Sequence, residues 1–196
     1  MHRRSVLQLG LVAVGAAALP HVAAAAARGA RWTTLFDGKS LKGWTPIGNA
    51  NWSLVDGAVQ ADMGNGLLVS DRTFGDVEIR TQIWVDEKAN SGVFVRCTNP
   101  MAVSAANAYE FNVFDTRPDP SYGTGAIVDV AKVSPMPKAA GKWSDLEILA
   151  KGDHLTFKFD GKVTADAMDT KHAHGRIALQ YGAGAVKFRR VLIREL

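Results

Sequence analysis

Apolar and polar residues alternate along most of the chain beyond residue 30, in short runs separated by Gly, Asp and Pro. In the run "DVEIRTQIWVD", every second residue from Val77 to Val85 is apolar or Thr. This period of two predicts β-strands, and turn pairs such as Asp56-Gly57 and Asp160-Gly161 predict hairpins between them. Many short strands of this kind predict an all-β fold, most simply a jelly-roll β-sandwich of two antiparallel sheets.

The stretch "AYEFNVFDT" combines a predicted core face with a polar face. Alternation places Tyr109, Phe111 and Val113 on one face, and Glu110 and Asn112 on the other. The polar face is either a solvated outer surface or the floor of a binding cleft with a carboxylate base and a hydroxyl partner. The two longest irregular stretches, "CTNPMAVSAANA" and "DTRPDPSYGTG", flank this strand, and loops concentrate binding groups. Their position favours a site near Glu110.

Two further strand residues are candidates for ligand contact. In "NSGVFVRC", alternation places Arg96 beside Phe94, and a planar cation next to an aromatic ring suits a carbohydrate or an anionic intermediate. A surface arginine lying over apolar neighbours is the alternative. Gln180 in "GRIALQYG" either binds hydroxyl groups or is an ordinary exposed strand residue. Cys97 alternates with Val95 and is therefore expected to be a small buried residue rather than a nucleophile.

Other motifs have weaker links to function. His172 and His174 in "TKHAHGR" suggest a metal site, but the segment resembles a loop and the remaining ligands cannot be identified. Tyr122 is a candidate for stacking on a sugar ring, with ordinary packing as the alternative.

The N-terminal segment is typical of an export signal. Arg3 and Arg4 precede a short apolar run, Pro20 and an alanine tract, so we expect residues 1–27 to be removed. "RRSVLQ" resembles the twin-arginine motif, with an ordinary secretory signal as the alternative. Residues 28–196 would then form a single domain in the periplasm or outside the cell, without any stretch apolar enough to span a bilayer.

The charge and the cysteine content of the chain bear on nucleic-acid binding and on disulfide bonding. Removing the signal takes away two arginines and no acidic residue, which lowers the formal net charge from +4 to +2. This balance does not indicate a nucleic-acid partner. The single cysteine, Cys97, excludes an internal disulfide.

Several segments together resemble the 3-keto-disaccharide hydrolase domain family. They occur in the family's order and are "LFDGKSLKGW", "NSGVFVR", "YEFNVFD", "YGTGAI", "GKW", "GRIALQYG" and "VKFRRVLIREL". The resemblance implies a concanavalin A-like jelly roll, the lectin/glucanase architecture. It also implies action on glycosides oxidised at C3, where a base removes the C2 proton, the C1 substituent is eliminated and water then adds.

The resemblance also assigns roles to individual residues. Glu110 matches the strand carboxylate and is the candidate base, and Arg96 is the candidate contact for the enolate or a hydroxyl. Gln180 matches the family's glutamine and is a candidate for substrate binding, to which the strand pattern adds Asn112 and the aromatic side chain adds Tyr122. Asp115 matches an acidic strand-end position and is a candidate for contact with substrate or with a divalent cation; no other cofactor is indicated.

One departure from the family pattern leaves two functions open. Many members continue after the glutamine with an Asp-His pair, whereas this chain reads Gln180-Tyr181-Gly182. The first hypothesis is an exported enzyme that cleaves 3-keto-glycosides, and the second is a non-catalytic, lectin-like carbohydrate-binding domain. A retaining glucanase is disfavoured, because Glu110 and Asp115 fall on opposite strand faces and too far apart for a carboxylate pair.

Overall fold

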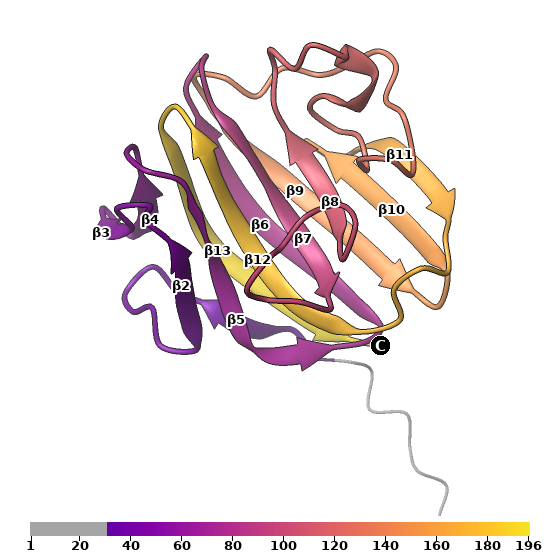
Figure 1. Cartoon of the computed structure of the whole chain (residues 1–196), viewed down its shortest axis with the longest axis horizontal. Helices are drawn as coiled ribbons and strands as arrows, with labels where there is room; N and C mark the ends of the chain where they lie inside the picture. The colour runs from indigo at the N-terminus through magenta and orange to yellow at the C-terminus, as the bar shows by residue number, and fades with distance from the viewer. Residues whose placement is uncertain (1–30) are drawn as a thin grey trace, which may run out of the picture.

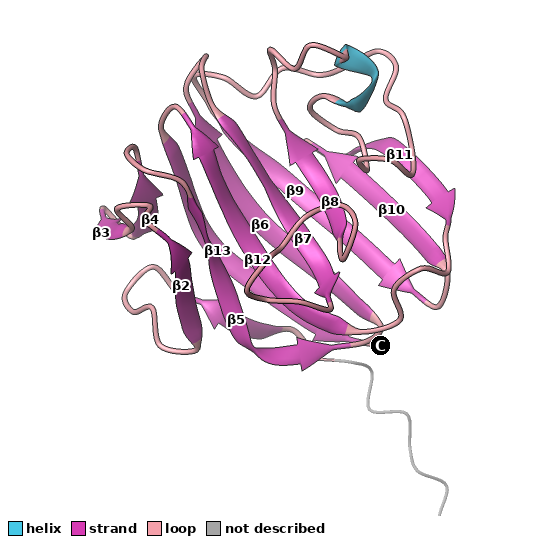
Figure 2. Ribbon diagram, viewed as in Figure 1, coloured by secondary structure: helices cyan, strands magenta, loops and turns pink. Residues whose placement is uncertain are grey.

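The computed structural model describes residues 31–196, which form two antiparallel β-sheets packed face to face (Figures 1 and 2). The larger sheet has the order β11-β10-β9-β6-β13-β4-β3, with β1 paired to β13 outside this path. Its strands are β1 (Thr33–Phe36), β3 (Ser53–Val55), β4 (Ala58–Ala61), β6 (Val77–Val85), β9 (Trp143–Lys151), β10 (His154–Phe159), β11 (Lys162–Met168) and β13 (Val186–Glu195). The jelly-roll sandwich predicted from the alternation is confirmed.

The smaller sheet has five strands in the order β2-β5-β12-β7-β8 and faces the viewer in Figure 1. Its strands are β2 (Trp44–Gly48), β5 (Gly66–Phe74), β12 (Gly175–Ala183), β7 (Asn90–Cys97) and β8 (Tyr109–Val113). The strand β8, which carries Glu110, therefore lies at one side of this sheet, next to β7.

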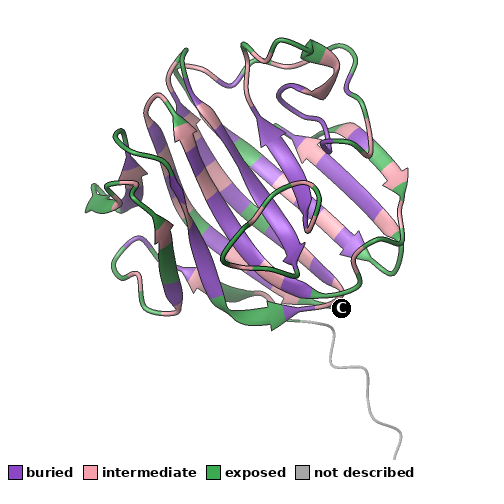
Figure 3. Cartoon of the chain, in the orientation of Figure 1, coloured by how far each residue is buried: buried purple, intermediate pink, exposed green. Residues whose placement is uncertain are grey.

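The main core fills the space between the two sheets (Figure 3). Val93 and Val95 of β7, with Phe111 and Val113 of β8, are all buried there, as the alternation predicts. The Phe111 ring meets Phe157 of the opposite sheet edge to face, with ring centroids 5.4 Å apart. The inward face of β8 is therefore fixed by packing, and Glu110 and Asn112 point to the outer face of the smaller sheet.

That outer face carries a second, smaller apolar cluster, made of Val69, Phe94, Cys97, Ala108 and Ala178. The loop 98–108 between β7 and β8 lies across the front of the sheet in Figure 1, and its Val103 packs against the cluster. The hydrogen bonds of this loop join its own residues, for example the Thr98 amide to the Asn107 carbonyl at 2.9 Å. The loop therefore covers part of the sheet mainly through apolar contact.

A bulge in β7 overturns two predictions about side-chain direction. The register between β7 and β12 shifts near Phe94 and Cys97, and Arg96 has a φ of +54°. One extra residue reverses the alternation beyond it. Cys97 therefore packs in the outer cluster with Phe94, rather than in the core with Val95, and Arg96 does not share the face of Phe94.

The chain after β8 turns back beside it. A 3-10 turn, η1 (Pro120–Tyr122), comes first. The residues after this turn extend the sheet beside β8, and the Asn112 amide donates to the Ala126 carbonyl at 3.0 Å. The Val128 amide in turn donates to the Glu110 carbonyl at 3.0 Å. This return brings the loop with Arg117 and Asp129 close to the outer face of β8.

The predicted signal, residues 1–27, lies outside the described residues. Within residues 31–196, the structure has no helix with the length and apolar character needed to cross a membrane.

Candidate functional site

Glu110 lies in a row of residues that crosses the smaller sheet. In this row Glu110 pairs with Phe94 of β7, which pairs with Ala178 of β12. The next row is formed by Asn112, Gly92 and Gln180. Sheet pairing thus brings the carboxyl of Glu110 beside two amide side chains that are separated by a glycine, on a face that also carries the apolar cluster of Phe94 and Ala178.

Glu110 is 8% exposed, and its burial raises the pKa of its carboxyl from 4.5 to about 7. The Arg117 guanidinium and the neighbouring Gln180 amide both act to lower this pKa. The Asp129 carboxylate acts to raise it. Desolvation outweighs the attraction of the nearby cation, so Glu110 exchanges a proton near neutral pH, as a general base needs to do.

Two buried amide oxygens in this area lack hydrogen-bond partners among the described residues: Asn112 Oδ1 and Gln180 Oε1. The Asn112 amide is held in place because its Nδ2 donates to the Tyr122 carbonyl at 2.7 Å. A Cβ atom on Gly92 would lie 2.8 Å from the Phe111 carbonyl oxygen and 3.4 Å from Gln180 Oε1. Gly92 therefore leaves room between the two amides, whose oxygens are buried acceptors without a partner among the described residues.

Tyr122 contributes to this area through its backbone carbonyl. Its ring lies under the Lys132 ammonium, 5.6 Å from the ring centroid, and is half-buried. Tyr122 therefore fixes Asn112, and the stacking of its ring on a sugar stays a prediction.

Asp115 is fully engaged with protein groups. Its carboxylate accepts hydrogen bonds from the Thr124 hydroxyl at 2.6 Å and from the amides of Ala139 and Ala140 at 2.9–3.1 Å. The Lys138 ammonium donates to its carbonyl at 2.9 Å. These bonds tie two loops together, and a carboxylate saturated in this way is a poor cation ligand.

Arg96 is placed away from Glu110. Its guanidinium, 2% exposed, donates to the carbonyls of Gly75, Gly152 and His172 and pairs with the Asp76 carboxylate at 2.9 Å. Four of its five N–H groups are used in these bonds. The positive φ at Arg96 explains the difference from the sequence prediction, because it turns the side chain to the face of Tyr109 rather than that of Phe94.

The histidine pair does not form a metal site in the part of the chain that the structure describes. No group of three His, Cys, Asp or Glu residues is arranged there to hold a metal ion. The His172 ring instead packs edge to face on Tyr109, with centroids 5.0 Å apart. The His172 amide also donates to the Tyr109 hydroxyl at 3.0 Å, so this segment is held against β8 by packing and by a hydrogen bond.

Comparison with known proteins identifies the family. A family model described as the 3-keto-alpha-glucoside-1,2-lyase-like domain matches residues 31–194. The chain belongs to this family. The match spans both sheets and confirms the family resemblance seen in the sequence motifs. No curated protein matches the chain.

Solved structures share the fold of this 3-keto-alpha-glucoside-1,2-lyase-like domain. Two proteins of Parabacteroides distasonis, each named "putative glycosyl hydrolase", align with TM-scores of 0.76 and 0.71 at 16% and 24% identity. The alignments cover 84% and 85% of this chain and 94% and 100% of the other chains. The carbohydrate-binding module CBM66 of Bacillus subtilis aligns with a TM-score of 0.62 at 18% identity, over 78% of this chain and 96% of the module.

Two residues near Glu110 were not singled out from the sequence. Arg117 and Asp129 both act on its pKa, and both lie in the return from β8. The position of the flanking loop "DTRPDPSYGTG" predicts that binding groups concentrate there, but its sequence does not show which charged residue turns toward the sheet. In this lyase-like domain, Arg117 is therefore the cation whose charge acts on Glu110, whereas Arg96 is bound elsewhere.

Proposed function

We propose that the protein is an exported enzyme that cleaves 3-keto-glycosides, with Glu110 as the base. The observation that carries the proposal is a buried carboxyl with a pKa of about 7, next to two buried amide oxygens that have no hydrogen-bond partner among the described residues. A group with this pKa is half ionised at neutral pH and can both remove and return a proton. Membership of the lyase-like domain family supports the substrate class.

The proposed chemistry needs one proton acceptor that later acts as a donor. The C3 ketone acidifies the C2 proton, which Glu110 removes, and the C2–H electron pair forms an enolate. Collapse of the enolate forms the C1–C2 double bond and expels the C1 oxygen, which takes the proton from Glu110. Water then adds across the new double bond, so the net result is hydrolysis and no oxidant or reductant is consumed.

Three residues near Glu110 have further roles in the proposed reaction. The Arg117 guanidinium, whose positive charge acts on Glu110, is the candidate to stabilise the enolate oxygen. Gln180 lies beside the Glu110 carboxyl, and Asn112 Oδ1 and Gln180 Oε1 become acceptors for sugar hydroxyls when the substrate displaces the groups that bury them.

A specific observation favours a second candidate, a carbohydrate-binding domain without catalysis. The position after Gln180 holds Tyr181, which is buried in the core and donates its hydroxyl to the Gly184 carbonyl at 3.0 Å. At Gly182, a Cβ atom would lie 2.9 Å from Asn90 Nδ2 and 3.0 Å from the Asn90 carbonyl oxygen. A histidine proton shuttle therefore has no room at residue 182 unless Asn90 moves, and catalysis depends on Glu110 alone.

The test is incubation of the purified protein with a 3-keto-glucoside that carries a chromogenic leaving group. Release of the chromophore by the wild type, and its loss in Glu110→Gln, supports the enzyme. Repeating the assay with a chelator shows whether a divalent cation takes part. Saturable binding of the 3-keto-glucoside without release of the chromophore would instead favour the binding domain.

A further inference from the structure

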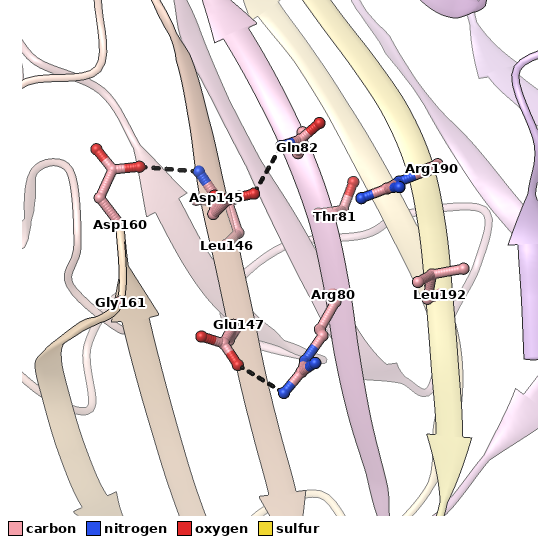
Figure 4. Close-up of a pocket in the computed structure, with 10 residues that line it drawn as sticks. All are labelled: Arg80, Thr81, Gln82, Asp145, Leu146, Glu147, Asp160, Gly161, Arg190 and Leu192. Atoms are coloured by element: carbon pink, nitrogen blue, oxygen red, sulfur yellow. Dashed lines mark hydrogen bonds and ion pairs between the residues drawn. The ribbon is translucent and has the colours of Figure 1, made fainter. Parts of the chain in front are cut away.

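The outer face of the larger sheet carries a groove of about 500 Å³, on the side of the sandwich opposite to Glu110 (Figure 4). Strands β6, β9 and β13 and the turn between β10 and β11 provide its walls. Its polar lining consists mainly of Arg80, Gln82, Asp145, Glu147, Asp160 and Arg190. The volume lies within the usual range for small-ligand sites.

One wall is a hydrogen-bonded row that runs across the strands. Gln82 Oε1 accepts from Arg189 Nε at 2.7 Å, and Gln82 Nε2 donates to Asp145 Oδ1 at 2.8 Å. The Asp145 amide donates to Asp160 Oδ1 at 2.9 Å, which brings the β10–β11 turn into the row. These side chains are already ordered, so a ligand would not have to immobilise them.

The facing wall contains the ion pair between Arg80 and Glu147, at 3.2 Å. Within the described part of the chain, Asp145 Oδ2 and Glu147 Oε1 have no hydrogen-bond partner. Each carboxylate thus keeps one oxygen free to accept a hydrogen bond from a ligand.

Arg190 adds a free donor to the groove. It lies at a bulge between β13 and β6, has a φ of +50°, and makes no side-chain hydrogen bond or ion pair with residues 31–196. In Figure 4 its guanidinium points from β13 toward Thr81, across the groove. The left-handed conformation costs a residue other than glycine about 1 kcal/mol, and such strain concentrates at functional sites.

The charges of the groove select the class of ligand. Arg80 is neutralised by Glu147, and Asp160 is paired with Lys142 at 2.6 Å, so neither sign of charge dominates. This balance does not suit a phosphate or a nucleic acid. Hydroxyl groups both donate and accept hydrogen bonds, and they match a lining that offers a guanidinium and two free carboxylate oxygens. Beside the groove, the Arg189 guanidinium carbon lies 4.1 Å from the centroid of the Trp143 ring.

We propose that this groove is a second carbohydrate-binding site, for a neutral oligosaccharide, independent of the Glu110 site. It would hold the protein on a glycan while the other sheet acts on its own substrate. The proposal does not depend on the chemistry assigned to Glu110, because the two sites lie on different sheets.

The test is an NMR titration of the full chain carrying Glu110→Gln with neutral tetrasaccharides of glucose, mannose, galactose and xylose, each at millimolar concentration. We expect at least one of them to shift the amide signals of Gln82, Asp145 and Glu147 in a saturable way. Absence of saturable shifts at these residues with every tetrasaccharide would overturn the proposal, as would shifts confined to the smaller sheet.

Two variants and a control sharpen the test. Arg190→Gly suits the positive φ and removes the guanidinium, so it should fold and should weaken binding about tenfold, the effect of about 1.4 kcal/mol. Arg190→Lys, which keeps a cation, should restore part of the affinity. The control Lys151→Ala, at the end of β9 on the same sheet and outside the groove lining, should bind like the parent. Equal affinity of Arg190→Gly and the parent would rule out the proposed role of Arg190 and with it the site.

Discussion

Glu110 combines an ionisable group with surroundings that resist its ionisation. Phe94 lies opposite it in the sheet and the apolar cluster continues beyond, so water has little access to the carboxyl. Arg117 and Gln180 offset part of the desolvation, and the resulting pKa is about 7. Burial, rather than a second carboxylate at close range, is therefore the main cause of the raised pKa on which the proposed role of Glu110 rests.

The first prediction concerns turnover by Glu110→Gln. The amide keeps the shape of the side chain but cannot accept the C2 proton, so kcat on a 3-keto-glucoside should fall about 10²–10⁴-fold while binding remains. In the wild type, kcat should rise with pH and level off above a midpoint near pH 7, because only the ionised form is active. Steady-state kinetics from pH 5 to about pH 9 check both points. An unchanged kcat in the variant would exclude Glu110 as the base.

The second prediction concerns stability and applies even if the protein is not an enzyme. The pKa of Glu110 is raised in the folded state, so the folded protein holds a proton that the unfolded chain has lost between pH 4.5 and about 7. Stability therefore falls as pH rises through this window, by about 3 kcal/mol in total. Glu110→Gln removes this loss and should be more stable than the wild type at pH 8 but not at pH 4.5, as urea unfolding at the two pH values would show.

The third prediction separates a structural Arg96 from a catalytic one. Arg96→Ala leaves three carbonyls and the Asp76 carboxylate without their donor, so the free energy of unfolding should drop by about 2 kcal/mol or more. At a temperature where the variant is folded, kcat should be close to that of the wild type. A large fall in kcat with an unchanged melting temperature would instead place Arg96 in the reaction.

At the scale of strands, alternation predicts the elements well but fails at bulges. Val93, Val95, Phe111 and Val113 lie in the core as predicted, because a regular strand fixes which side chains share a face. Arg96 and Arg190 both lie at register shifts and have positive φ, which a sequence without glycine at these positions does not reveal. The neighbours of Glu110 in β12 and β7 follow from sheet order, a long-range property that alternation does not encode.

The fourth prediction concerns the loop 98–108, which covers the outer apolar cluster. Because its hydrogen bonds are internal and Val103 supplies the apolar contact, Val103→Asp should release the loop from the sheet. We expect faster hydrogen exchange confined to this loop, with little change in the melting temperature. Met101→Asp is the matched control, since Met101 is 72% exposed and should alter neither quantity. Global destabilisation by Val103→Asp would show that the loop is an integral part of the core.

For the molecule as a whole, the two sheets present unlike outer faces. The smaller sheet has an apolar cluster with one buried carboxyl at its margin, whereas the larger sheet has a groove lined by paired charges and a free arginine. The sequence motifs were sufficient to place the chain in its family, because they extend over most of residues 31–194. They did not indicate the groove, since its lining comes from four separated segments whose polar residues look like an ordinary solvated face.

The fifth prediction follows from export, which we propose on the basis of residues 1–27. The described domain contains one buried free cysteine, Cys97, so its fold requires no disulfide and can be completed in a reducing cytoplasm. That is compatible with the twin-arginine route, which carries folded proteins. Changing Arg3 and Arg4 together to Lys should leave unprocessed precursor in the cytoplasm, as fractionation and immunoblotting would show. A matched change of Arg28 and Arg31 to Lys, beyond the expected cleavage site, should leave export intact. If processed protein still reached the periplasm after the first change, the segment would be an ordinary secretory signal.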